Sequence, residues 1–189
     1  MTNAVRLRPP LSESEVVELE VGDRVSLSGP MYGARDAAHK KMVDLLDQKK
    51  PLPVDLRGHV IFYVGPTPAP PGKPIGSAGP TTSLRMDAYA PRMYEYGVRA
   101  TVGKGNRGQP VIDALVKHRA AYLIAIGGLG ATLAQQIRSA KVVAYPELGT
   151  EALWEFQVED FPAIVANDAR GRDIFREGQE LWAKRLAVA

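Results

Sequence analysis

The chain has 189 residues, of which 45% are hydrophobic and 24% charged, and its formal net charge is +3. This fits one domain with a real core. The scattered Lys and Arg lack the basic stripe of a nucleic-acid-binding protein, no apolar stretch reaches the roughly 18 residues that a membrane span needs, and the N-terminus lacks an apolar signal, so we expect a cytoplasmic protein.

Cysteine is absent from the sequence. This excludes disulfides, thiolate nucleophiles and thiolate-ligated metal or iron–sulfur sites within the chain. The three histidines, His39, His59 and His118, lack metal-ligand spacing. We therefore expect no metal or cofactor to be bound by this chain alone, and any metal chemistry must come from another chain.

The N-terminal third reads as an arm followed by strands. Residues 1–15 contain Pro9-Pro10 and little periodicity, which predicts an extended arm ahead of a domain over 16–189. Residues 16–28 alternate around Gly22-Asp23, as short strands do on either side of a turn. Gly29-Pro30 is expected to break the strand.

Further along, strands and helices alternate. Short apolar runs predict strands at 60–64, 99–102, 121–126, 141–145, 152–158 and 162–166. Apolar residues at helical spacing predict helices at about 34–50, 85–96, 110–118, 131–139 and 174–188. The pattern indicates a mixed α/β fold with a β-rich part, in one domain.

The first candidate loop, Ser28–His39, joins a predicted strand to a helix start, where backbone N–H groups favour anions. Arg35 in the first turn opposes the helix dipole, so a docked carboxylate would suit it. The alternative is an ion pair with Asp36 or another surface acid. His39 lies one turn later on the same face and is either an acid/base group or a hydrogen-bonded structural histidine.

The second candidate loop is rich in proline and glycine. Residues 65–79 can be neither helix nor central strand, and a rigid loop of this length is usually functional. It leads to Thr81 and Thr82, which supply hydroxyls, and to Arg85, which offers a bidentate fork for a carboxylate. Capping of the following helix is the alternative for the hydroxyl residues.

The third candidate loop, Gly103–Gly108, presents Lys104 between two glycines, which indicates an exposed ammonium available to a carboxylate. Its spacing does not match a phosphate-binding P-loop. Arg35, Arg85 and Lys104, with the nearby hydroxyls, suit a small dicarboxylate.

Four runs of residues resemble a known family. They are Gly33-Ala-Arg-Asp-Ala-Ala-His-Lys40, Gly79-Pro-Thr-Thr-Ser-Leu-Arg-Met-Asp87, Gly103-Lys-Gly-Asn106 and Glu147-Leu-Gly-Thr-Glu-Ala-Leu-Trp154. In this order they resemble the C-terminal part of class I (iron–sulfur) fumarases, which also exists as the separate beta subunit of two-subunit fumarases and of L-tartrate dehydratase. The resemblance runs from about Val21 to Phe175. Leu84 departs from it, because fumarases more often have glycine there.

The resemblance implies a single swivelling β/β/α domain, with a mixed sheet or an open, barrel-like β core and flanking helices. It implies that Thr81 acts in catalysis at the reacting carbon, with His39 in a supporting acid/base role. The substrate-binding residues expected are Arg35, Arg85, Lys104 and Thr82. A partner alpha subunit is implied to hold a [4Fe–4S] cluster through three cysteines, with one open iron acting as a Lewis acid on the substrate.

The function expected from this resemblance is reversible hydration of fumarate to (S)-malate, with this chain as the beta subunit, active only with its cluster-bearing partner. One alternative is dehydration of L-tartrate to oxaloacetate by the same residues. A less favoured alternative is a non-enzymatic domain that binds dicarboxylates.

Overall fold

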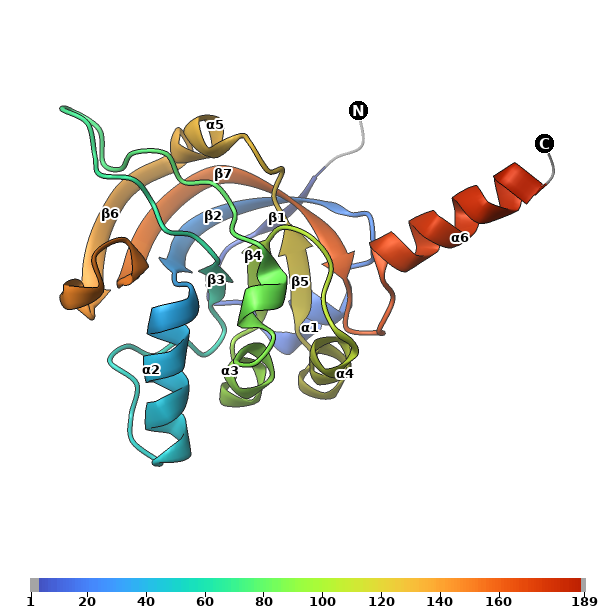
Figure 1. Ribbon diagram of the computed structural model, residues 1–189, viewed down its shortest axis with the longest axis horizontal. Helices are drawn as coiled ribbons and strands as arrows, with labels where there is room; N and C mark the ends of the chain where they lie inside the picture. Colours follow the sequence, from blue (N-terminus) through green and yellow to red (C-terminus); the bar gives the residue numbers. More distant parts are fainter. Residues whose placement is uncertain (1–3, 188–189) are drawn as a thin grey trace.

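The computed structural model describes residues 4–187, and its strands form one mixed sheet (Figure 1). The strands are β1 (Val5–Leu7), β2 (Arg24–Gly33), β3 (Val60–Phe62), β4 (Ala100–Gly103), β5 (Ala121–Ile124), β6 (Ile137–Ala144) and β7 (Leu153–Asn167). The α-helices are α1 (Glu13–Val17), α2 (Asp36–Asp47), α3 (Ala90–Tyr96), α4 (Gln109–His118), α5 (Gly130–Ala134) and α6 (Ile174–Ala187), and the 3₁₀ helices are η1 (Ser83–Met86) and η2 (Pro146–Glu151).

The sheet closes into a five-stranded barrel. Strands β2, β3, β4 and β5 are neighbours and parallel. The long strand β7 then pairs antiparallel with both β5 and β2, which joins the two edges. Strands β1 and β6 extend the sheet outside the barrel, on β2 and β7. The predicted fold class, an α/β domain with a mixed sheet, a barrel-like β core and flanking helices, is confirmed.

Successive side chains of the barrel strands point alternately inward and outward. In β3, Val60 and Phe62 belong to the interior cluster, whereas Ile61 packs with the residues of the helices. In β5, Leu123 is interior and Tyr122 lies on the helix side. Because both faces are covered, these strands read as continuous apolar runs in the sequence rather than as an alternation of apolar and polar residues.

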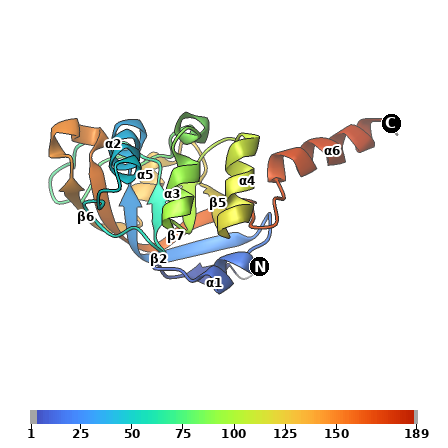
Figure 2. The same ribbon diagram turned by 90° about the horizontal axis from the view of Figure 1, so that it is seen from below.

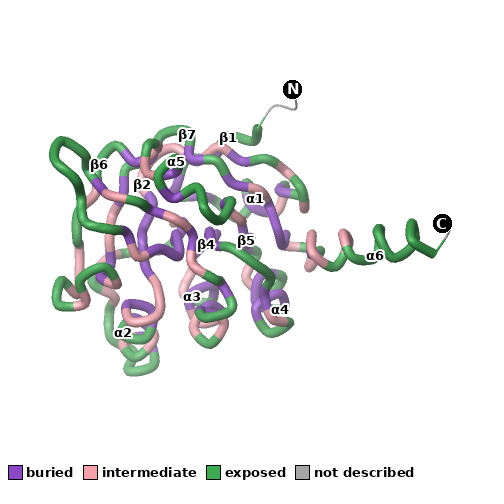
Figure 3. Tube along the Cα trace, turned by 45° about the horizontal axis from the view of Figure 1, so that its top comes forward, coloured by how far each residue is buried: buried purple, intermediate pink, exposed green. Residues whose placement is uncertain are grey.

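The helices α2, α3 and α4 lie side by side over one face of the barrel (Figures 1 and 2), and α1 lies apart from them, below β2 in the view of Figure 2. The C-terminal helix α6, predicted from the sequence, extends away from the body. It contains no buried residue, which Figure 3 shows as its mostly exposed and intermediate colouring.

The structure corrects the predicted arm, of which residues 1–3 lie outside the described residues, and the first predicted strand, because no strand begins between residue 16 and Gly22. Residues 5–7 join the sheet as β1, and 13–17 form the short helix α1, not extended chain. Ser12 and Glu15 form a reciprocal capping box at its start, a signal present in the sequence but not used in the prediction.

Gly29-Pro30 does not break β2, which the sequence had predicted to end there. Between the pairings with β1 (25–27) and β3 (32–33), β2 has a partner strand on one side only, β7. A proline, which has no N–H to donate, is tolerated where one side of a strand is unpaired. A register shift between Leu27 and Gly29 absorbs the irregularity.

The region after β5 also differs from prediction. The helix expected over 131–139 ends at Ala134, and β6 begins at Ile137 because antiparallel pairing with β7 outweighs local helix preference. The two strands expected at 152–158 and 162–166 are one strand, β7. It bends at Asp160, whose φ is 51° and whose backbone N–H donates to the Ser28 hydroxyl.

Truncation of Phe161 tests the barrel interior. Phe161 is fully buried and lies edge-on to Phe62, with ring centroids 5.2 Å apart. Phe161→Ala should lower the free energy of unfolding by about 3–5 kcal/mol, measured by urea denaturation. Trp182→Ala on α6, where the side chain is 59% exposed, should change it by no more than about 0.5 kcal/mol. Equal effects from the two variants would contradict this packing.

Candidate active site

The predicted site residues gather at one edge of the barrel. Arg35 follows the carboxyl end of β2, Thr81 returns to the end of β3, and Lys104 follows β4. Because these strands are parallel, their carboxyl ends lie at the same end of the barrel. Segments far apart in the sequence are thereby brought together.

Backbone hydrogen bonds connect the Thr81–Ser83 segment to the residues that follow β3 and β4. The Thr81 N–H donates to the Tyr63 carbonyl at 2.7 Å. On the other side, the Lys104 N–H donates to Thr81 O at 3.2 Å and the Ser83 N–H donates to Lys104 O at 3.0 Å. Main-chain hydrogen bonds therefore hold Thr81 and Lys104 next to each other.

The proline-rich loop that precedes Thr81 is tied back on itself. The Ser77 N–H donates to the Thr67 hydroxyl at 2.7 Å, and the Thr67 N–H donates to Ser77 O at 3.0 Å. The Ala78 N–H donates to Gly130 O at 3.0 Å, which anchors the end of the loop on α5. The hydrogen bonds at Ser77 and Ala78 thus fix the part of the loop that leads into Thr81.

Arg35 and Arg85 both form ion pairs with the Asp36 carboxylate. The Nε atoms of Arg85 and Arg35 lie 2.9 Å and 3.3 Å from the two oxygens of Asp36. Partial burial would raise the pKa of the Asp36 carboxyl, but the hydrogen bonds and charge of Arg85, with Arg35, hold it below the usual value. Asp36 therefore stays ionised and keeps the two guanidinium groups adjacent.

Glu151, at the end of η2, supports Arg35 from across the chain. Its Oε1 lies 3.1 Å from Arg35 Nη2, and its Oε2 accepts a hydrogen bond from the Ala37 N–H at 3.1 Å. Arg35 is the N-cap of α2 but has no side-chain cap of its own, so Glu151 supplies the missing acceptor at the helix N-terminus. A Cβ at Gly65 would lie 2.9 Å from Arg35 Nη1, so a larger residue there would require the Arg35 side chain to shift.

Thr82 and Lys104 are exposed, and Thr81 is partly exposed. Within residues 4–187, Lys104 has no ion pair. Thr82 is the N-cap of η1 but makes no capping hydrogen bond through its side chain, so the capping alternative does not explain it. These groups face outward with free polar atoms in the described chain.

His39 lies beneath the site. It is completely buried, its Nδ1 lies 2.9 Å from Arg35 O, and its ring packs edge-on against Tyr63. Desolvation lowers the pKa of its imidazole to about 4, so the ring is neutral at pH 7. Its contact is with the backbone that carries Arg35, which fits the structural alternative better than direct contact with a substrate.

Sequence reasoning missed Arg107 and Asp87. The Arg107 side chain is fully buried, and its Nε lies 2.8 Å from Asp87 Oδ1. Asp87 Oδ2 accepts a hydrogen bond from the Gly108 N–H at 2.7 Å. Both residues stand within the motifs quoted above or next to them, but nothing in their spacing indicates that a charged pair is buried there.

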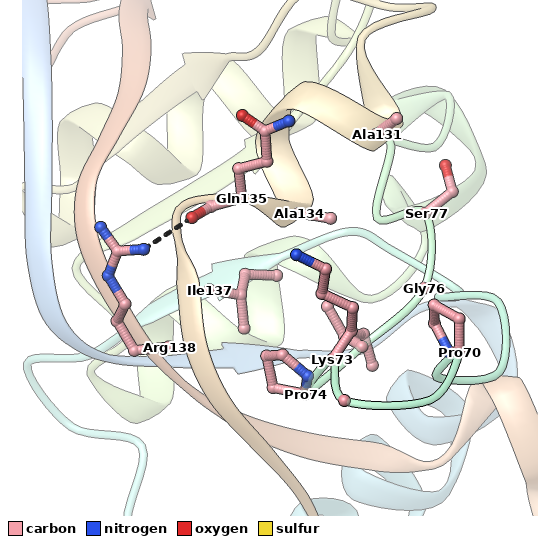
Figure 4. A pocket seen from close by; sticks show the side chains of 12 residues that line it. Pro70, Lys73, Pro74, Gly76, Ser77, Ala131, Ala134, Gln135, Ile137 and Arg138 are labelled. Atoms are coloured by element: carbon pink, nitrogen blue, oxygen red, sulfur yellow. Dashed lines mark hydrogen bonds between the residues drawn. The ribbon is translucent and has the colours of Figure 1, made fainter.

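A cavity of about 580 Å³ lies away from these residues, between the proline-rich loop and the α5–β6 segment (Figure 4). Its lining, from 70–77 and 131–138, includes Lys73, Ser77 and Arg138 but none of the six predicted site residues. The candidate site is therefore separate from this cavity.

Over residues 4–187, no group of three or more His, Asp or Glu side chains is arranged to hold a metal ion. The same residues include no helix that is both long enough and apolar enough to cross a bilayer.

Comparison with known proteins decides the family. The family model for the fumarase C-terminus matches residues 1–178. The chain belongs to this family. It is 45% identical over 177 residues to the anaerobic class I fumarate hydratase of Escherichia coli K12, covering 92% of this chain and 32% of that protein. It is 41% identical to fumarate hydratase 2 of Leishmania major, over 90% of this chain and 31% of that protein.

A second kind of relative has a different length. The beta subunit of L(+)-tartrate dehydratase from Escherichia coli K12 is 34% identical over 95% of this chain and 90% of its own length. This member of the fumarase C-terminus family thus spans about a third of the length of the fumarate hydratases that it matches. It spans 90% of the length of the tartrate dehydratase beta subunit. The resemblance predicted from the four motifs is confirmed.

Titration of His39 should make stability depend on pH. The unfolded chain binds protons at an ordinary histidine pKa of 6.5, whereas the folded pKa is about 4. Between these values the unfolded state binds more protons, so stability is full above pH 6.5 and falls as the pH drops toward 4. We expect about 2 kcal/mol to be lost from this group between pH 7 and pH 5.

Urea denaturation of wild type and His39→Gln at pH 7 and pH 5 measures the contribution of His39 to the free energy of unfolding. The variant should lack that part of the pH dependence, and His118→Gln, at a less buried histidine, should keep it. The same pH dependence in wild type and His39→Gln would show that His39 is not buried in a neutral state.

Proposed function

We propose that this chain is the beta part of a two-part hydro-lyase that hydrates fumarate reversibly to (S)-malate. The observation that carries the proposal is the gathering of Arg35, Arg85 and Lys104 beside Thr81 at one edge of the barrel, in a member of the fumarase C-terminus family. Three cations suit the two carboxylates of a small dicarboxylate, and the exposed Lys104 is open to a ligand.

In this proposal each side chain has a distinct task. Arg35 and Arg85, adjacent through Asp36, bind one carboxylate of the substrate through guanidinium forks, and Lys104 binds the other as a point charge. Holding both ends orients the carbon–carbon bond that gains or loses water.

The threonines act between the two carboxylate sites. Thr81 contributes its hydroxyl at the reacting carbon, where it takes part in proton transfer, and Thr82 donates a hydrogen bond to the substrate. The neutral His39 keeps the backbone of Arg35 in place through its 2.9 Å contact with Arg35 O. The acid that faces Thr81 across the substrate comes from the partner.

A [4Fe–4S] cluster does not fit this chain. The sequence has no cysteine, and residues 4–187 hold no metal-binding group of His, Asp or Glu. We propose that the cluster is ligated by a separate alpha subunit. The near-complete coverage of the tartrate dehydratase beta subunit supports this division into subunits. A cytoplasmic location stays a prediction from the sequence.

Dehydration of L-tartrate is the second candidate. The coverage of 90% of the tartrate dehydratase beta subunit favours it, whereas the higher identity to fumarate hydratases, 45% against 34%, favours fumarate. Both substrates are four-carbon dicarboxylates, so the same cations serve either of them. The polar groups around the reacting carbons decide between them.

The deciding experiment is anaerobic hydration of fumarate by this chain, alone and mixed with a cluster-loaded alpha subunit, with L-tartrate assayed in parallel. We expect activity only in the mixture, with fumarate preferred. Preference for tartrate would establish the second candidate. A stable complex with an intact cluster but no activity on either acid would refute both, and dicarboxylate binding by the chain alone would then favour a non-enzymatic domain.

Arg85→Ala should remove a charge-assisted contact with a carboxylate. The side chain is 51% exposed, so folding should be little affected. We expect kcat/KM in the assembled enzyme to fall by the equivalent of about 2–5 kcal/mol in transition-state binding. Arg138→Ala, at an exposed arginine remote from the site motifs, is the control. Near-normal kcat/KM in Arg85→Ala would remove Arg85 from the site.

Thr81→Ala should separate turnover from binding. If the hydroxyl acts in proton transfer, kcat should fall by about 10²–10⁴-fold with little change in KM, measured by steady-state kinetics of the assembled enzyme. Thr82→Ala, the neighbouring residue with a proposed binding role, should instead raise KM. A Thr81→Ala variant with raised KM and normal kcat would reduce Thr81 to a binding contact.

A further inference from the structure

We propose that the buried Arg107–Asp87 ion pair is a positioning unit that fixes the places of Thr81 and Lys104. The proposal rests on the proposed function only in taking those two residues as active-site groups. Arg107 is not a contact to substrate, because its side chain has no exposed surface, and the two oxygens of Asp87 are taken by Arg107 and the Gly108 N–H.

Arg107 is the centre of a buried polar cluster. Its guanidinium lies over the rings of Tyr122 and Tyr63, 4.9 Å and 5.4 Å from their centroids. Its Nε pairs with Asp87 at 2.8 Å, and its Nη1 donates to the Tyr63 hydroxyl at 3.3 Å. Contacts with two aromatic rings and a carboxylate restrict the orientation of the guanidinium.

Each neighbour of Arg107 is bonded in turn to the site backbone. Tyr63 accepts, at its carbonyl, the hydrogen bond from the Thr81 N–H. The Tyr122 hydroxyl donates to Gly105 O at 2.8 Å, one residue after Lys104, and lies 2.8 Å from the Ser83 hydroxyl.

Asp87 closes the other end of the Lys104 loop. Its second oxygen accepts from the Gly108 N–H. The Lys104 loop is therefore fastened at Gly105 and Gly108, and the Thr81–Ser83 segment at Tyr63 and Ser83, all around one guanidinium. The pair and its aromatic neighbours thus set the geometry on which the Thr81–Lys104 pairing depends.

Stability alone does not account for this pair. Desolvating two charges costs about as much as their attraction returns, so apolar replacements of similar size are often neutral or stabilising. The Arg107 Nη2 is also buried without a partner among the described residues, a further cost that an apolar side chain would not incur. What apolar replacements cannot supply is the directional bonding to Asp87 and Tyr63.

The double variant Asp87→Leu/Arg107→Met removes both charges without leaving either one unpaired. Its matched control is Arg138→Gln/Glu159→Gln, which removes an exposed ion pair of similar length, 2.7 Å. We would measure amide hydrogen exchange by NMR in the whole chain for Thr81, Ser83 and Lys104, with Ala121 in the barrel as an internal reference. Thermal unfolding is measured alongside.

We expect the three site amides to exchange at least about tenfold faster in the Asp87→Leu/Arg107→Met variant, while Ala121 stays protected and the chain stays folded. Unchanged protection at all three positions would overturn the proposal. Should the double variant fail to fold, Arg107→Lys is used instead, because it keeps the positive charge but loses the guanidinium fork. Hydrogen exchange at the same three amides then tests whether Arg107 positions Thr81 and Lys104.

Kinetics in the assembled enzyme give the second readout. Misplacement of Lys104 should raise KM for fumarate and lower kcat/KM on the order of 10- to 100-fold. A purely structural role would lower the amount of active enzyme, and hence kcat, with KM unchanged, and that result would overturn the proposal. If wild type turns over neither fumarate nor tartrate, the proposed function fails, and hydrogen exchange still decides the role of the pair.

Discussion

The antiparallel pairing of β2 with β7 is the constraint on which the rest of the molecule depends. It joins the edges of the sheet into a barrel, and its register places Gly33 opposite Trp154. Arg35 and Glu151 lie just beyond this register pair, so barrel closure itself brings the Glu151 carboxylate to the first turn of α2. The parallel pairing of β2, β3 and β4 places their carboxyl ends at the same end of this barrel.

The three cationic side chains at this end of the barrel differ in how many acidic partners they have. Arg35 has two acidic partners, Asp36 and Glu151, and Arg85 has one. Lys104 has none among residues 4–187. The arginines are thus held in place before a ligand binds, at the expense of part of their attraction for it, whereas Lys104 keeps its full charge for an anion. The paired guanidinium groups supply orientation, and the exposed Lys104 ammonium supplies attraction.

Beneath these exposed groups lies a layer of buried polar residues. His39 is held neutral below Arg35, and Arg107 is held charged below Thr81 and Lys104. Polar groups in a low-dielectric interior are costly unless their geometry is satisfied, so such a layer restricts the loops above it to few arrangements. The two layers together explain how this exposed surface can keep a defined shape.

The sequence by itself determined the fold class, the family and the identity of the loops that carry the candidate site. Continuous apolar runs in β3 and β5, and the Gly79–Asp87 and Gly103–Asn106 motifs, are local signals that survive in a single sequence. The capping box formed by Ser12 and Glu15 is also a local signal in the sequence. The sequence left open whether Arg35 has an acidic partner or His39 is buried, because neither property is local.

Only the tertiary structure decided how distant residues meet. The pairing of β6 with β7 replaced an expected helix with a strand, and β2 continued through Gly29-Pro30 because one side of it is unpaired. Arg35 meets Glu151 across 116 positions, and Arg107 is buried with Asp87. The physical reason is that burial and ion pairing depend on which segments the closed barrel brings together, and barrel closure is a property of the whole chain.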